Sequence, residues 1–206
     1  MKMRFVAIIG LVFLALSACS SAPKVSRVDP NKQVDLSGNW NDTDVRKVCD
    51  SLIKDCLSSE RVANYIQQFS SRNGGRLPTV IVGTFRNNSS EHIDTTIISK
   101  SMEIAIVNSG KLDFVAGGDT RNELRMERND QQGNASESTA SAVGNETGAN
   151  FMLTGAVKMI EDRAGNMAVR SYFVSAELTN IETNTRLWMG ENNDIKKVIE
   201  RPRAKI

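Results

Sequence analysis

The sequence predicts an α/β protein in which a mixed sheet is flanked by helices and the chain ends in an antiparallel meander. Three observations lead to this class. Amphipathic helical stripes occupy residues 42–73, a short run that is apolar on both faces follows at 78–83, and residues 150–189 alternate between apolar and polar side chains. Helices that alternate with strands at the start, and consecutive strands at the end, indicate one mixed sheet covered by helices.

The beginning of the chain has the pattern of a secretory signal peptide. Lys2 and Arg4 precede the apolar stretch Phe5–Leu16, which is shorter than the ~20 residues that a membrane-spanning helix needs. We therefore expect residues 1–18 to be a signal peptide that is removed from the mature chain.

The signal ends in Leu16-Ser17-Ala18-Cys19, which resembles a bacterial lipobox. A cysteine in this position is acylated before cleavage, so Cys19 is the expected lipid attachment site of a protein that is anchored to a membrane without crossing it. Ser20, where an Asp would be typical of retention, favours sorting to the outer membrane, with the folded domain facing the periplasm. An ordinary signal peptide with a chance cysteine is the alternative.

Residues 19–36 are expected to form the lipidated N-terminus and a flexible tether. They contain two prolines, several serines and lysines and no apolar periodicity, and fully extended they reach at most about 60 Å. The folded domain is expected over residues 37–198, followed by a short tail at 199–206.

The first predicted helix begins at an N-cap, Asn41 or Asp42, because either side chain can accept an orphan backbone N–H. Its apolar residues recur at steps of three and four and form one buried stripe. Ser58 or Ser59 caps a second helix, which Gly74-Gly75 stops. The first stripe consists of Val45, Val48, Cys49, Leu52, Ile53, Cys56 and Leu57.

The middle of the chain predicts two strands and three further helices. The strand at 78–83 is central, and a polar loop over residues 86–92 leads to a helix that ends at Gly110. A short strand is expected at 111–116, a charged helix from residue 119 or 120 to about 130, a loop at 131–135, and a helix from Ser136 to Gly148.

Three strands close the chain. The expected segments are 150–160, 167–180 and 186–189, joined by turns at 163–166 and 182–184. Together with the two earlier strands they complete the mixed sheet.

Composition and motifs exclude several classes of function. The formal net charge is +2, and Lys2 and Arg4 lie in the segment expected to be removed, so the mature chain is neutral and has no charge footprint for nucleic acid. No glycine-rich phosphate loop is present. No cofactor, metal or enzymatic activity is therefore expected.

The chemically reactive residues do not form a catalytic or metal-binding pattern. His92 is the only histidine, and it lies in a polar loop. Cys49 and Cys56 are seven residues apart on the apolar stripe of one helix, a rise of about 10.5 Å, which is too far for a disulfide. We expect both cysteines to be reduced and buried.

Several segments together resemble the LpoB-type family of outer-membrane lipoproteins that activate penicillin-binding proteins. The resemblance covers about residues 35–198, and the order of the segments makes it specific. The segments are Asp35-Leu36-Ser37-Gly38-Asn39-Trp40-Asn41-Asp42-Thr43-Asp44, Pro78-Thr79-Val80-Ile81-Val82-Gly83, Arg86-Asn87-Asn88-Ser89-Ser90-Glu91-His92-Ile93, Asp130-Gln131-Gln132-Gly133, Glu146-Thr147-Gly148-Ala149-Asn150-Phe151-Met152-Leu153-Thr154-Gly155 and Asn180-Ile181-Glu182-Thr183-Asn184-Thr185-Arg186-Leu187-Trp188.

The resemblance implies an α/β sandwich with a roughly four-stranded sheet, related to a domain of curli-type secretion lipoproteins. It also implies a non-enzymatic regulator that reaches from the outer membrane to a peptidoglycan synthase, a penicillin-binding protein, and stimulates it. The expected contact residues lie in two polar loops. The first follows the predicted central strand, and partner loops of α/β sheets tend to lie beyond strand ends. They are Arg86, Asn87, Asn88, Ser89, Glu91 and His92 in the first loop, and Asp130, Gln131 and Gln132 in the second.

Other interpretations of the loops and of the function stay open. The Asn and Ser side chains of the loops can instead satisfy turn backbone. The protein can also be a structural or secretion-associated lipoprotein that assembles into an oligomer at the membrane, which suits a short tether. A cell-wall hydrolase is the weakest class, since no convergent catalytic set is visible.

Overall fold

The structure, a computed structural model, describes residues 23–202, so the predicted signal peptide and Cys19 lie outside the described residues. The chain divides into two compact units, Met1–Gln33 and Val34–Ile206. In the first unit, residues 23–33 contain only a turn, closed by a hydrogen bond of 3.0 Å from the Lys32 N–H to the Asp29 carbonyl. All helices and strands described below belong to the second unit.

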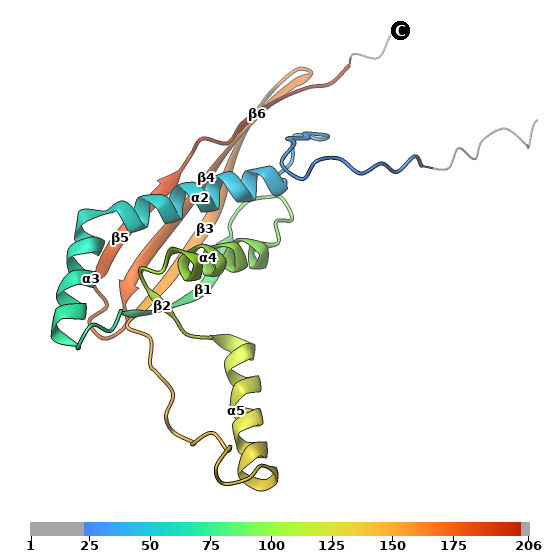
Figure 1. The fold of residues 1–206 in the computed structure, drawn as a ribbon. Coiled ribbons are helices and arrows are strands. Elements are labelled where there is room, and N and C mark those ends of the chain that lie inside the picture. Colours follow the sequence, from blue (N-terminus) through green and yellow to red (C-terminus); the bar gives the residue numbers. More distant parts are fainter. Residues whose placement is uncertain (1–22, 203–206) are drawn as a thin grey trace, which may run out of the picture. The chain divides into compact units, whose positions relative to one another are not determined.

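A six-stranded mixed sheet forms the second unit's centre (Figure 1). The strand order is β2-β1-β3-β4-β5, and β6 also pairs with β4. β1 is parallel to β2 and to β3, whereas the pairs β3–β4, β4–β5 and β4–β6 are antiparallel. The strands are β1 (Thr79–Asn87), β2 (Asp113–Phe114), β3 (Phe151–Ala164), β4 (Met167–Asn180), β5 (Arg186–Asn192) and β6 (Lys196–Glu200).

The predicted α/β class with a mixed sheet and a closing antiparallel meander is confirmed. The sheet has six strands rather than about four, because β6 and the two-residue β2 add to its edges. β6 was not predicted, since Lys196–Glu200 has the composition of an exposed tail and becomes a strand only by pairing with residues 167–171 of β4.

In the described part of the chain, four helices accompany the sheet. They are α2 (Asp42–Ser58), α3 (Glu60–Arg72), α4 (Thr95–Ser109) and α5 (Gly118–Asn134). Asn41 caps α2 in a capping box: its side chain accepts from the Asp44 N–H at 3.2 Å, and the Asp44 carboxylate accepts from the Asn41 N–H at 3.0 Å. The predicted apolar stripe of α2 is confirmed, since six of its seven residues are buried.

α2 and α4 both cover the same face of the sheet (Figure 1). The buried strand residues alternate with half-buried or exposed ones, which is the pattern of a sheet packed on one side only. We call the side that carries these alternate residues the open sheet face. The residues that point toward the helices include Phe151, Leu153, Val157, Tyr172, Val174, Leu178 and Trp188.

Small residues let large rings lie flat on the helix-covered face. Gly155, Ala176 and Gly190 are in register across β3, β4 and β5. A Cβ added at Gly155 would lie 2.3 Å from the Phe85 ring, and one added at Gly190 would lie 2.3 Å from the Trp188 ring. The aromatic rings therefore need glycine at these two positions.

α5 and the segment that follows it form an arm, residues 118–149, that extends away from the sheet (Figure 1). α5 buries none of its side chains. The helix predicted from Ser136 to Gly148 is wrong, because residues 135–150 contain only turns. Ser136 starts a single turn that ends at Ala140, and Gly144 has a φ of +87° that breaks a helix.

Candidate functional site

The loop after β1 is held in shape by its own polar side chains. The Asn87 side chain donates to the Glu91 carbonyl at 2.7 Å and accepts from the Ser89 N–H at 3.0 Å and the Ser89 hydroxyl at 2.7 Å. The Ser89 hydroxyl in turn accepts from the Glu91 N–H at 3.2 Å. Asn87 and Ser89 thus satisfy turn backbone, whereas Arg86, Asn88 and His92 are exposed.

Glu91 points away from the surface. Its carboxylate accepts hydrogen bonds from the Tyr172 hydroxyl at 2.8 Å, from Arg170 Nη1 at 2.8 Å and from the Trp40 backbone N–H at 3.0 Å. The side chains of Glu91 and Arg170 are only 11% and 13% exposed. Glu91 is therefore a largely buried structural residue that joins the loop, β4 and the segment before α2, and its predicted role as a contact residue is not retained.

The positive charge of Arg170, which binds Glu91, is also neutralised by a second carboxylate. Arg170 also binds Glu161 across β3 and β4, with a Nε–Oε2 distance of 2.5 Å. Hydrogen bonds from Arg163 and Arg170 lower the pKa of Glu161. Burial raises the pKa of Tyr172, and the hydrogen bond to Glu91 acts in the same direction, so that Tyr172 stays a neutral donor. The cluster is a structural tie, without a free nucleophile or base.

The open sheet face carries a shallow hollow of about 440 Å³. Arg86 and Asn88 line one end of it, Thr154 and Ala156 of β3 lie in its middle, and Met189 of β5 is 63% exposed. This hollow brings together strand residues that the sequence places more than 60 positions apart, and it includes two of the predicted contact residues. The remaining lining residues are Thr84, Met152, Gly155, Ser175, Ala176, Glu177 and Gly190.

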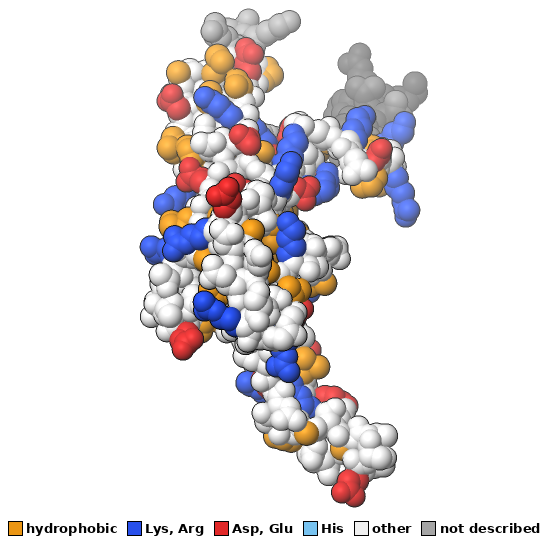
Figure 2. Space-filling model, turned by 60° about the vertical axis from the view of Figure 1, so that its left-hand side comes forward, with side chains coloured by type: hydrophobic (Ala, Val, Ile, Leu, Met, Phe, Trp, Pro, Cys, Tyr) orange, Lys and Arg blue, Asp and Glu red, His pale blue; other side chains and the backbone are white. Residues whose placement is uncertain are grey.

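The hollow is mixed in charge and polarity. Arg86 is exposed, and the Glu177 carboxylate, with its side chain 31% exposed, binds Arg186 of β5 at 2.8 Å. Lys and Arg side chains are likewise interspersed with Asp and Glu over the face that Figure 2 presents. A surface of this kind suits a protein partner better than a polyanion.

The sequence predicts Arg86 and Asn88 at the charged end of this hollow but does not predict Thr154 and Ala156 in its middle. The open-face residues alternate with core residues in β3 and β4, so the alternation shows that they share a face. Nothing in the sequence shows that the helices cover only the other face.

The second predicted contact segment lies elsewhere. Asp130, Gln131 and Gln132 belong to α5 and not to a loop, and they lie near the free end of the arm (Figure 1). The Gln132 side chain donates to the Ser141 carbonyl at 2.8 Å, while Gln131 accepts from the Ser141 N–H at 3.0 Å. They hold the end of the arm together, and the structure does not bring them to the loop after β1.

Among the residues that the structure describes, the cysteines form no disulfide and the carboxylates form no metal site. Cys49 and Cys56 are free and buried, as predicted, and burial raises the pKa of each thiol to about 12. Within residues 23–202, no three His, Cys, Asp or Glu side chains are grouped so that they could hold a metal ion. No helix in that range is both long enough and apolar enough to span a membrane.

Comparison with protein families identifies the fold's relatives. The family described as "Peptidoglycan-synthase activator LpoB" matches residues 44–193, well over half of the chain. The chain belongs to the LpoB family. The match runs from Asp44 in α2 through β5 and includes the arm and the hollow on the open sheet face, whereas β6 lies outside it.

Solved structures of LpoB domains are similar at low sequence identity. The C-terminal domain of LpoB from Salmonella enterica is 14% identical, with a TM-score of 0.42, over 77% of this chain and 99% of that one. For the LpoB domain from Escherichia coli the identity is 14% and the TM-score 0.43, over 72% and 96%. The lipoprotein GNA1162 from Neisseria meningitidis is 11% identical, with a TM-score of 0.37, over 62% and 88%. No curated protein sequence matches the chain.

Proposed function

We propose that this chain is an outer-membrane lipoprotein that binds a peptidoglycan synthase of the penicillin-binding type and stimulates it without catalysing a reaction itself. The observation that carries the proposal is the LpoB family match over residues 44–193. It is supported by the chemistry of the Glu91–Arg170–Tyr172 cluster, whose titratable groups bind one another and serve as a structural tie. A regulator that acts by binding needs an accessible contact surface, and the open sheet face is such a surface.

The contact surface in this proposal is the open sheet face. Arg86 provides a charged anchor at one end of the hollow, and Met189 provides an exposed apolar side chain at the other side. Flexible methionine and arginine side chains are enriched in protein interfaces. The sheet beneath them is rigid, because its other face is packed against α2 and α4.

The membrane anchor in this proposal is an acyl group on Cys19. The lipobox-like sequence Leu16–Cys19 supports it. A Cys19→Ala variant should leave outer-membrane fractions, and equal amounts of variant and wild type in those fractions would refute the anchor. This test addresses the anchor independently of the synthase.

The decisive experiment measures glycan polymerisation by the cell's own penicillin-binding proteins, each purified and assayed with and without the full chain in detergent. At least one synthase should bind the chain and polymerise faster. Absence of both binding and stimulation with every synthase would overturn the proposal.

Matched variants test the surface. Arg86→Glu at one end of β1 should weaken binding about tenfold or more, whereas Arg76→Glu, which is exposed before the other end of β1, should not. Met189→Glu should likewise weaken binding, and Met126→Glu on α5 is its control, since the two side chains are 63% and 64% exposed. Equal effects of the paired variants would move the contact away from the open sheet face.

A second candidate function is an oligomeric assembly at the membrane, and one observation favours it. α4 exposes three apolar side chains on its outer side, Ile97, Ile104 and Val107, each more than half exposed. An apolar helix stripe of this kind suits self-association. Sedimentation of the full chain in detergent distinguishes the two: a closed oligomer that Ile104→Glu dissociates supports assembly, and a monomer supports the regulator.

A further inference from the structure

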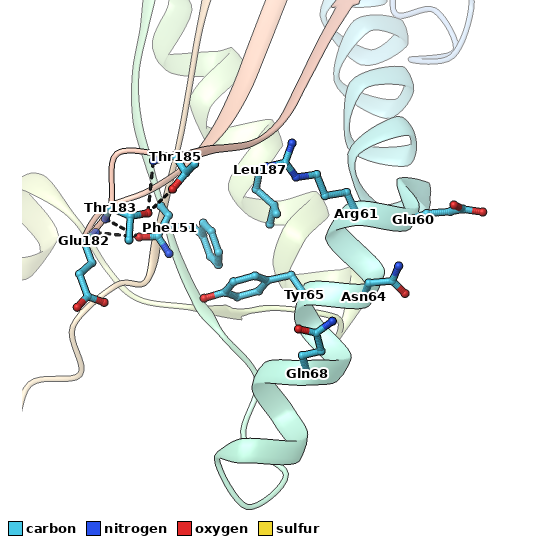
Figure 3. Close-up of a pocket in the computed structure, with 11 residues that line it drawn as sticks. Glu60, Arg61, Asn64, Tyr65, Gln68, Phe151, Glu182, Thr183, Thr185 and Leu187 are labelled. Carbon is cyan, nitrogen blue, oxygen red and sulfur yellow. Dashed lines mark hydrogen bonds between the residues drawn. The ribbon is translucent and has the colours of Figure 1, made fainter.

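A second cleft lies at the end of the sheet where β4 turns into β5, between α3 and that turn (Figure 3). Its volume is about 730 Å³, within the range of about 300–1,000 Å³ for small-molecule sites. It shares no residue with the hollow on the open sheet face. The two sites can therefore be changed separately.

The inner wall of this cleft is aromatic. Tyr65 of α3 meets Phe151 of β3 edge to face, with ring centroids 4.9 Å apart and an interplanar angle of 81°. Phe151 is 1% exposed and so fixes the position of the Tyr65 ring. On its other side Tyr65 stacks on Phe69, with centroids 6.2 Å apart. Leu187 of β5 completes the apolar wall above the two rings (Figure 3).

Unused polar groups surround this wall. Arg61, Asn64 and Gln68 line the cleft from one side of α3, at the spacing of successive helix turns. Among the described residues, the side chains of Arg61, Asn64 and Gln68 and the Tyr65 hydroxyl form no hydrogen bond or ion pair. These groups can all bond a ligand without breaking a contact of the protein.

The opposite wall is rigid and polar. The Asn180 side chain accepts from the backbone N–H groups of Glu182 and Thr183 at 3.0 and 2.9 Å. The backbone of the turn is closed by bonds from the Asn180 N–H to the Thr185 carbonyl at 2.8 Å and from the Asn184 N–H to the Asn180 carbonyl at 2.9 Å. An extended peptide would need free backbone groups to add as a strand, and the turn offers none at these positions.

We propose that this cleft binds a glycan strand that carries N-acetyl groups. A sugar ring has an apolar C–H face that packs on an aromatic ring, and hydroxyl groups at its rim that bond to side-chain amides. The acetamide group matches the amides of Asn64 and Gln68, and its methyl group matches Leu187. Two carboxylates, Glu60 and Glu182, accompany the single guanidinium of Arg61, which disfavours a phosphorylated ligand.

The experiment uses the full chain in detergent and a β-1,4-linked tetramer of N-acetylglucosamine as the probe. Saturation-transfer NMR should show contact at the acetyl methyl and ring protons, and calorimetry gives the Kd. The corresponding glucose tetramer, which lacks the acetamide, should bind at least tenfold more weakly. Absence of binding of the N-acetylated probe, or equal binding of the two, would overturn the proposal.

Neighbouring residues on α3 supply matched variants. Gln68→Ala should weaken binding about fivefold, which equals about 1 kcal/mol, the usual net contribution of one hydrogen bond. Gln67→Ala changes a neighbouring side chain that is also exposed but does not line the cleft, and it should leave the Kd unchanged. Equal effects of the two variants would contradict the assignment.

Tyr65→Ala should abolish binding, and because Tyr65 packs on Phe151 this variant can also disturb the fold. The double variant Asn64→Ala/Gln68→Ala keeps the aromatic wall and changes only exposed side chains. It should weaken binding at least tenfold, and unchanged binding would refute the site. Glycan binding and synthase stimulation are separate readouts. Gln68→Ala should weaken only glycan binding and Arg86→Glu should weaken only synthase binding, so either proposal can fail without the other.

Discussion

The Tyr172 hydroxyl donates a 2.8 Å hydrogen bond to the Glu91 carboxylate, which joins the middle of β4 to the loop that follows β1. The same carboxylate binds Arg170 and the Trp40 backbone N–H. Trp40 packs on Tyr172 with ring centroids 5.3 Å apart. One acidic side chain therefore connects three segments that are up to 132 positions apart in the sequence.

Glu91→Ala should destabilise the fold by about 3 kcal/mol. The substitution leaves the Arg170 guanidinium, the Tyr172 hydroxyl and a backbone N–H without their partner, and removing one member of a buried ion pair is strongly destabilising. Unfolding by urea should show a lower midpoint with an unchanged slope.

The control for this prediction is Glu103→Ala. Glu103 pairs with Lys100, whose side chain is 71% exposed, so its loss should cost less than about 1 kcal/mol. Equal destabilisation by the two substitutions would show that Glu91 is only a surface residue. In that case its predicted role in partner contact would return.

The direction of the Glu91 side chain could not be predicted from the sequence. The pattern Arg86–His92 predicts a polar loop, but β1 continues through Arg86 and Asn87, so the loop begins only at Asn88. The direction of each side chain depends on contacts with β4 and the segment before α2. Arg86 and Asn88 face the hollow, whereas Glu91 faces the interior. Such long-range contacts leave no local periodicity.

Local patterns predicted most of the elements because they are set by neighbouring residues. The apolar stripe from Val45 to Cys56 and the alternation in β3 and β4 are repeated many times, and each repeat supports the same assignment. The predicted helix after Ser136 does not form, because the segment has a capping residue but no apolar face to bury against the rest of the protein. β6 was missed because its strand character comes from pairing with β4.

Gly155→Ala should destabilise the protein by about 2 kcal/mol. The new methyl group would lie 2.3 Å from the Phe85 ring and 2.5 Å from the Ser175 carbonyl oxygen, and backbone on one side leaves little room for relaxation. Thermal unfolding should show the loss. Gly133→Ala in α5 has open space around its Cβ and a helical position, so it should not lower stability.

Cys49 and Cys56 should resist alkylation in the folded protein. Their side chains are 2% and 3% exposed, and burial raises the pKa of each thiol to about 12, so the thiolate is scarce at any ordinary pH. In a Cys19→Ala variant, mass analysis should show two unmodified thiols until denaturant is added. Labelling of the folded protein should not rise between pH 7 and 9, as that of an exposed thiol would. A disulfide between the two cysteines would contradict the continuous helix α2.

The arm should open in acid. Glu146 accepts hydrogen bonds from Arg125 and Arg128, at 2.9 and 2.7 Å, and these bonds lower its pKa from 4.5 to about 2. Because the pKa in the folded arm lies below that of the free carboxyl, the ion pairs stabilise the arm fully above about pH 4.5. This stabilisation is lost as the pH falls toward 2.

Hydrogen exchange measures the opening of the arm directly. Amides of α5 should exchange faster as the pH falls through this range, after correction for intrinsic rates, while amides of β3 and β4 stay protected because α5 buries no side chain. In the Glu146→Gln variant the amides of α5 should already exchange faster at pH 7. Adding 1 M salt should reduce the difference in exchange rate between this variant and the wild type. Glu137→Gln changes another carboxylate of the arm, one without an ion pair among the described residues, and should have no effect. Protection of α5 that is equal in wild type and Glu146→Gln would show that the arm is held by contacts other than these ion pairs.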